Sequence, residues 1–129
     1  MKFEEFGIQA SFCDYLRLVH PNFLFMSDTI GNVKLNGSQA ARNARIQCQK
    51  FKCPDVIIFE PTEKYKGLFL EFKKSTPFKK DGTTLLSNEH VQAQQKSIND
   101  LKERGYYACF VWSKDMAIEI LNKYLDNSI

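Results

Sequence analysis

The sequence predicts an α/β domain in which helices cover both faces of one mixed β-sheet. Segments with helical and with strand periodicity alternate along the chain in the order α-β-α-β-β-α-β-α. The chain contains no internal repeat, low-complexity tract or linker, and 43% of its residues are hydrophobic. A single domain over residues 1–129 is therefore expected, with enough apolar surface for one core.

The first half of the chain predicts two helices separated by a short strand. An amphipathic helix is expected from Phe3 to Val19, where a His-Pro pair follows and ends it. Its expected apolar side is formed by Phe6, Ile8, Phe12, Tyr15, Leu16 and Val19. A strand is expected over 23–26. Ser38 is then expected to cap a polar helix over 39–49.

Two β-rich runs follow, Asp55–Phe59 and Gly67–Lys73, and their short connection containing Pro61 predicts a hairpin. A lysine-rich loop is expected over 75–86.

The last part of the chain predicts a helix, a strand and a helix. Ser87 is expected to cap the helix that runs to about Arg104, because Gly105 then stops it. The apolar run 106–112 has strand length. Ser113 or Lys114 is expected to begin the final helix.

Basic residues are unevenly distributed, although the net charge is only +3. Residues 29–54 contain five basic residues and no acid, and residues 64–80 contain six lysines and one acid. This uneven distribution of charge favours an anionic partner such as nucleic acid. The alternative is an ordinary surface of solvated lysines.

The sequence also argues against several other classes of protein. No apolar run approaches the length of a membrane span, and the N-terminus lacks the apolar core of a secretion signal. The four cysteines lack the paired spacing of a zinc site, so free thiols in a reducing cytoplasm are expected.

Two acids and a lysine coincide with the ends of the two central strands. Asp55 begins one run, and Glu71 and Lys73 end the next on the same face of the strand. Glu71 lies in an apolar run, where a carboxylate is costly unless it is paired or bound to a metal. The structural alternatives are that Asp55 caps a turn and that Lys73 is an ion-pair partner of Glu71.

This combination of residues suits metal-assisted phosphodiester hydrolysis. Asp55, Glu71 and the backbone carbonyl of Phe72 are hard oxygen ligands of the kind that Mg²⁺ prefers. Lys73 is then expected to orient the attacking water and to offset phosphate charge.

These residues resemble a known signature. Pro54-Asp55 followed by Glu71-Phe72-Lys73 is similar to the PD-(D/E)xK motif of nucleases, and the start Glu5-Phe6-Gly7-Ile8-Gln9 resembles the E-x-x-I-Q start of the VRR-NUC (virus-type replication-repair nuclease) branch. The branch is usually glycine-rich before its Pro-Asp pair, whereas this chain has Lys50-Phe51-Lys52-Cys53 there.

The second half of the chain extends the resemblance. Gln94, Leu101 and Gly105-Tyr106 match the Q-x(6)-L-x(3)-G-[YF] pattern of the helix that follows the ExK strand. The segments 107–111 and 113–118 are similar to the closing strand and helix of the branch. The likeness therefore runs from Glu5 to Tyr124 and is closest to the compact stand-alone form that phages encode.

The resemblance implies a PD-(D/E)xK restriction-endonuclease-like core and hydrolysis that depends on Mg²⁺ or Mn²⁺. It implies that Glu5 is a third acidic group near the metal and that Gln94 faces the site. Only the family spacing selects Gln94 over Gln92 and Gln95. It further implies a homodimer that acts on branched DNA such as a four-way (Holliday) junction, in a phage-infected or prophage-bearing cell.

Basic residues outside the motif are expected to contact DNA backbone without reading sequence. They are Arg42, Arg45, Lys74, Lys79 and Lys80. Arg42 and Arg45 share a helix side, and a dimer partner is the alternative contact for them. The other functions considered are a non-catalytic DNA-binding module on a nuclease fold and a restriction-type or recombination exonuclease.

Two polar residues near the motif leave their roles open. Gln9 lies one helical turn after Glu5, so it either orients Glu5 or is a surface glutamine. His90 is expected to be an exposed histidine, because PD-(D/E)xK chemistry does not require one.

Overall fold

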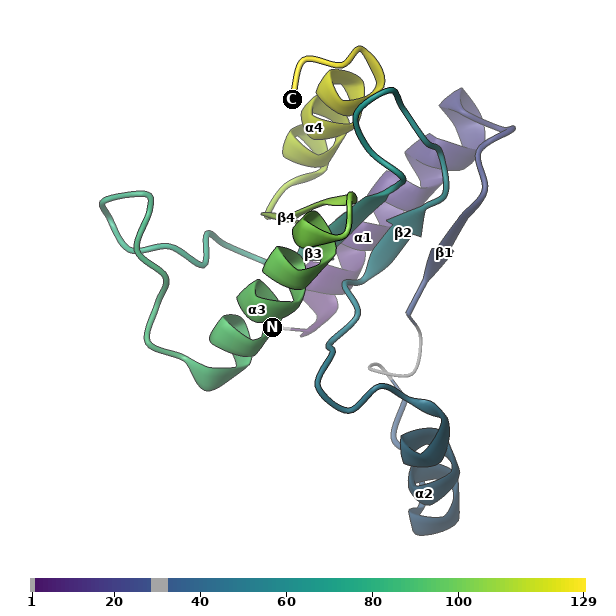
Figure 1. Cartoon of the computed structure of the whole chain (residues 1–129), viewed down its shortest axis with the longest axis vertical. Coiled ribbons are helices and arrows are strands. Elements are labelled where there is room, and N and C mark those ends of the chain that lie inside the picture. The colour runs from purple at the N-terminus through teal and green to yellow at the C-terminus, as the bar shows by residue number, and fades with distance from the viewer. Residues whose placement is uncertain (1, 29–32) are drawn as a thin grey trace.

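The computed structural model describes residues 2–28 and 33–129 (Figure 1). It contains helices and strands in the predicted order. Their bounds are α1 Lys2–Val19, β1 Phe25–Ser27, α2 Gly37–Ile46, β2 Val56–Ile58, β3 Leu68–Phe72, α3 Glu89–Glu103, β4 Tyr107–Val111 and α4 Lys114–Leu125. No helix of the described residues is long and apolar enough to cross a membrane.

The strands form one mixed sheet in the order β1-β2-β3-β4. β2 and β3 pair antiparallel with Val56 opposite Leu70, so the predicted hairpin is confirmed. β4 lies parallel to β3 with Cys109 opposite Leu70, because α3 carries the chain back across the sheet before β4 begins.

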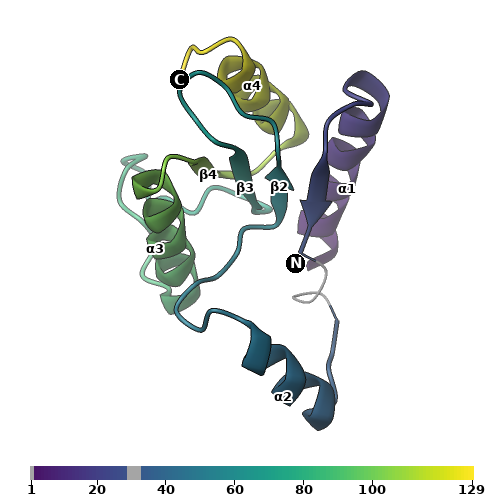
Figure 2. The same ribbon diagram turned by 45° about the vertical axis from the view of Figure 1, so that its right-hand side comes forward.

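Helices cover both faces of this sheet, as the fold-class prediction required (Figures 1 and 2). α1 and α4 pack on one face, where Phe12, Leu16 and Leu121 are fully buried against β2 and β3. α3 packs on the other face through Val91, Ile98 and Leu101. All five residues of β3 are buried for this reason.

Helix starts differ from the predicted caps at two places. Asn36, not Ser38, caps α2, because its side chain accepts from the backbone N–H of Gln39 at 2.8 Å and the Gln39 side chain bonds back to it. α2 then ends at Ile46 rather than at residue 49, since Gln47 is already extended. Asn88, not Ser87, caps α3, whereas α4 begins at Lys114 with Ser113 as its cap, at one of the two predicted starts.

The apolar side predicted for the first helix was wrong at its two ends. Phe6 is 59% exposed and Val19 is 48% exposed, whereas Gln9 is 9% exposed. The buried stripe of α1 is centred on Phe12, Cys13 and Leu16, where the helix crosses β3. Phe6 and Val19 lie at the ends of the helix, beyond this crossing.

Two segments stand away from the sheet. α2 contains no buried residue and lies apart from the other helices (Figure 2). The connection between β3 and α3 extends in another direction and is closed on itself by a bridge between Phe78 and Leu85 (Figure 1).

Candidate active site

The predicted acids meet because of the strand register. Val56 pairs with Leu70 in the antiparallel hairpin, so residue 55 lies beside residue 71 at the same end of the sheet. The Asp55 carboxylate accepts a hydrogen bond from the backbone N–H of Phe72 at 2.7 Å. Asp55 therefore does more than cap a turn: its side chain is fixed at the end of β3.

Glu71 is buried beside Asp55 and is only 5% exposed. Burial, together with the hydrogen bond and the negative charge of Asp55, raises the pKa of Glu71 to about 10, although the Lys73 ammonium acts in the opposite sense. Without another cation, this pair of carboxyl groups therefore keeps a proton at neutral pH. Such an arrangement favours the binding of a positive charge between the two groups.

Lys73 follows β3 and is held there by its backbone N–H, which donates to the carbonyl of Val111 at 2.8 Å. Its ammonium lies 5.9 Å from the centre of the Phe110 ring. Among the described residues, Lys73 forms no direct ion pair with Glu71. The alternative of a simple salt bridge is therefore wrong, and the lysine remains at the cleft.

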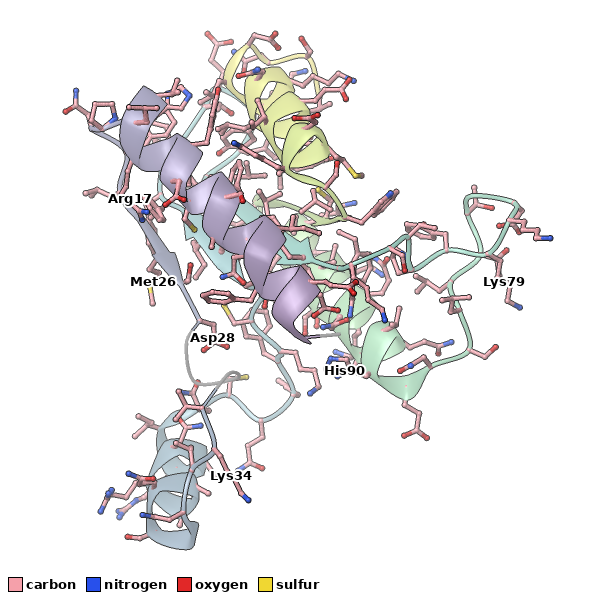
Figure 3. All side chains as sticks on the ribbon, turned by 180° about the vertical axis from the view of Figure 1, so that it is seen from behind. Arg17, Met26, Asp28, Lys34, Lys79 and His90 are labelled. Atoms are coloured by element: carbon pink, nitrogen blue, oxygen red, sulfur yellow. The ribbon has the colours of Figure 1, made fainter. Side chains whose placement is uncertain are left out.

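Glu71, Asp55 and Lys73 line a cleft of about 870 Å³. Its walls come from α1, the end of β1, α2 with the segment after it, and the start of α3. The other lining residues are Glu5, Met26, Ser27, Asp28, Asn43, Gln47, Cys48, Phe51, Lys52, Cys53, Ile57, His90 and Gln94. Figure 3 labels Asp28, directly after β1, and His90, on α3.

α1 contributes to the site in two ways. Glu5 lines the cleft, and its charge is one of the causes that raise the pKa of Glu71. Gln9 is buried and its amide donates to the backbone carbonyl of Asp55 at 3.4 Å. Gln9 is therefore not a surface glutamine; it ties α1 to the start of β2.

α3 presents Gln94 to the cleft, as the family spacing implied. Gln94 is 6% exposed, whereas Gln92 is exposed and Gln95 bonds to Asn99 at 2.8 Å on the same helix. The amide nitrogen of Gln94 lies 3.1 Å from Nε2 of His90. The amide oxygen of Gln94 is buried without a hydrogen-bond partner among the described residues.

The basic residues predicted to contact DNA do not line the cleft. All of them are exposed: Arg42, Arg45, Lys74, Lys79 and Lys80. From this part of the chain the cleft is instead lined by Asn43 of α2 and by Gln47 just after it, whose amide donates to Asn43 Oδ1 at 3.0 Å. Arg42 and Arg45 are exposed on α2, and Arg42 donates to Ser38 Oγ at 3.4 Å.

Sequence reasoning missed several residues of this cleft. Asp28 directly follows β1, and its backbone N–H donates to the carbonyl of Asp55 at 2.9 Å. An acid at a strand end was the signal that identified Asp55, and the same signal was present at Asp28. Cys53 also lines the cleft, and burial and the charges of Asp28, Glu71 and Asp55 raise the pKa of its thiol to about 11.

The donor set fits a hard divalent cation that keeps part of its water shell. Asp55 and Glu71 supply carboxylate oxygens, and the uncompensated burial of Glu71 favours a cation beside it. Within residues 2–28 and 33–129, no three His, Cys, Asp or Glu side chains converge as a complete metal-binding group. A cation here would therefore rely on backbone and water oxygens as well, which is usual for Mg²⁺.

One solved structure is similar over most of the chain. It is described as a "VRR_NUC domain protein", with a TM-score of 0.58 and 22% sequence identity, over 93% of this chain and 86% of that chain. The predicted VRR-NUC resemblance is thus confirmed at the level of the fold, an α/β domain with a four-stranded mixed sheet between helices. No protein-family model and no curated protein sequence matches the chain.

Proposed function

We propose that this protein is a metal-dependent DNA endonuclease that hydrolyses phosphodiester bonds. The observation that carries the proposal is the buried Glu71 carboxyl held against Asp55, with Lys73 directly after the same strand and, among the described residues, no ion pair between Lys73 and Glu71. A protein that only binds DNA gains nothing from two carboxyl groups that repel phosphate at the base of its cleft. The VRR_NUC fold supports the same function.

Each residue has a role in this proposal. Asp55, Glu71 and the backbone carbonyl of Phe72 would hold Mg²⁺ or Mn²⁺, and Glu5, which lines the same cleft, would act on the ion through water. When bound, the ion supplies Lewis-acid stabilisation of phosphate charge and lowers the pKa of water. Lys73 orients the attacking water and offsets charge on the phosphate. Gln94 faces the site from α3.

The preference for branched DNA is a further part of the proposal. α2 carries Arg42 and Arg45 and the 75–86 loop carries Lys79 and Lys80, and these two segments extend from the body in different directions (Figure 3). Two separate basic projections suit two DNA arms better than one straight duplex. Paired cuts across a two-fold junction would need a homodimer, and light scattering tests this by comparing the solution mass with the chain mass of 15.0 kDa.

A cleavage assay tests the proposal. A labelled four-way junction and a linear duplex of the same sequence are incubated with Mg²⁺, Mn²⁺ or EDTA. Wild type is compared with Lys73→Ala and with Lys74→Ala, which changes the adjacent exposed lysine outside the cleft. We expect metal-dependent cutting of the junction that only Lys73→Ala abolishes.

Other results would change the proposal in defined ways. Cutting of both DNAs would support metal-dependent hydrolysis and refute the preference for the junction. Equal activity in EDTA would refute the metal mechanism. Tight binding without cutting would favour a DNA-binding module on a nuclease fold.

A further inference from the structure

His90 is a cleft residue that the nuclease motif does not contain. It lies in the first turn of α3, four residues before Gln94, and its side chain is exposed at the cleft. Its Nε2 atom is 3.1 Å from the amide nitrogen of Gln94. No other described side chain hydrogen-bonds to its ring. The rest of the ring is therefore free to meet a ligand.

The contact with Gln94 determines which ring nitrogen of His90 carries the proton. An amide nitrogen only donates, so Nε2 of His90 must accept. The ring proton is then on Nδ1, and the ring is neutral. The surroundings support a neutral ring: partial burial and the charges of Lys73 and Lys52 lower the pKa of His90, although Glu5 and Asp55 act in the opposite sense.

A neutral ring with its proton on Nδ1 is a hydrogen-bond donor at the rim of an acidic cleft. Glu5, Asp55 and Glu71 already line this cleft, so an anionic substrate needs donors that face it. Gln94 is 6% exposed and lies on the packed side of α3. Its contact with Nε2 therefore fixes the orientation of the imidazole. The exposed part of the ring lies at the cleft, where a phosphate can reach it.

We propose that the Nδ1–H of His90 donates a hydrogen bond to a non-bridging oxygen of the substrate phosphodiester, with the ring fixed in that tautomer by Gln94. This inference rests on the proposed function and adds to it a phosphate-binding residue outside the PD-(D/E)xK motif. His90 binds and orients the phosphate, and Gln94 is its positioning residue. No bond is made or broken by either side chain.

The tautomer can be measured without any activity. The chain has two histidines, so long-range ¹H–¹⁵N spectra show two imidazoles, and His90→Asn identifies the signal of His90. We expect the proton on Nδ1 at neutral pH in wild type. Gln94→Glu has nearly the same shape but offers only acceptors, so it should move the proton to Nε2. A wild-type His90 with its proton on Nε2 would overturn the proposal.

DNA affinity tests the contact itself. Binding of a labelled four-way junction is measured by fluorescence anisotropy in EDTA, so that cleavage plays no part. His90→Leu should weaken binding about tenfold, the effect of losing one hydrogen bond to a charged group. His90→Asn keeps a donor near the Nδ1 position and should stay within about threefold of wild type. Gln92→Leu, an exposed change on the same helix outside the cleft, is the control.

The outcomes separate this inference from the proposed function. Equal affinity of His90→Leu and wild type would refute the phosphate contact and leave the nuclease proposal intact. Equal losses in His90→Leu and His90→Asn would also refute it, because a donor would then not matter. Absence of any DNA binding by wild type in EDTA would refute the phosphate contact of His90, and the cleavage assay with Mg²⁺ would still decide the nuclease proposal on its own.

Discussion

Replacing Glu71 by glutamine should stabilise the metal-free protein. The folded protein keeps the Glu71 carboxyl protonated at neutral pH, since its pKa is raised to about 10 from an ordinary value of 4.5. Folding at pH 7 therefore requires the uptake of a proton that the unfolded chain has released. Over the roughly 2.5 pH units between the ordinary pKa and pH 7, this costs about 3 kcal/mol at about 1.4 kcal/mol per unit. Glutamine keeps the shape and a donor toward Asp55, and it needs no proton.

The stabilisation by Glu71→Gln should grow with pH, because the wild-type free energy of unfolding depends on pH. The native state binds more protons than the unfolded state between pH 4.5 and about 10, so the wild-type free energy of unfolding falls as the pH rises through this window. The advantage of Glu71→Gln should thus be near zero at pH 4, about 1.4 kcal/mol at pH 5.5 and about 3 kcal/mol at pH 7. A chain of this size should gain roughly 10 °C in Tm at pH 7.

Thermal and urea unfolding in EDTA measure the effect. Glu63→Gln, an exposed change on the β2–β3 connection, is the control and should leave the pH dependence unchanged. Saturating Mg²⁺ should reduce the difference in free energy of unfolding between wild type and Glu71→Gln, because the cation stabilises only the ionised wild-type site. Equal stability of wild type and Glu71→Gln at pH 7, or a gap as large at pH 4 as at pH 7, would refute the electrostatic account of the site.

Three further predictions follow from other contacts. Asp55→Asn should abolish the Mg²⁺-induced rise in Tm, and a rise like that of wild type would remove Asp55 from the metal site. Tyr124→Phe should lower the free energy of unfolding by about 1 kcal/mol in urea titrations, because the hydroxyl donates to the part-buried backbone carbonyl of Glu60 at 2.7 Å. An unchanged free energy of unfolding would show that water replaces this bond. Replacing Arg42 and Arg45 together by glutamine should make the slope of log K against log salt shallower by about 2 in DNA-binding titrations, and an unchanged slope would exclude phosphate contacts by this pair.

Local sequence signals were strong enough to predict the order of elements. Alternating periodicities, the Pro61 connection and Gly105 separated the segments, and the mixed sheet followed from them. The caps at Asn36 and Asn88 were missed because asparagine and serine compete at neighbouring positions. Which residue caps a helix depends on its own backbone angles and on whether its side chain reaches the N–H groups of the first turn. The spacing of apolar residues reveals neither.

The site was predicted to the extent that strand register determines it. Asp55, Glu71 and Lys73 lie at strand ends, and pairing of the two strands in a hairpin places the acids side by side. The role of Gln9 was left open, and the exposed His90 was not placed at the cleft, for a different reason. Gln9 is buried because α1 crosses the sheet beside Asp55, and His90 reaches the cleft because α3 returns over the opposite face. These are contacts between elements far apart in sequence.

The sequence by itself determined the fold class, the hairpin and the acids and lysine at its end, because periodicity and turn chemistry act over a few residues. Only the tertiary structure decided that Glu71 is buried without an ion pair among the described residues, that Asp28 and His90 share its cleft, and that Arg42 and Arg45 do not line it. The physical reason is that burial and charge depend on which helices pack on each face of the sheet. That packing joins residues from both ends of the chain.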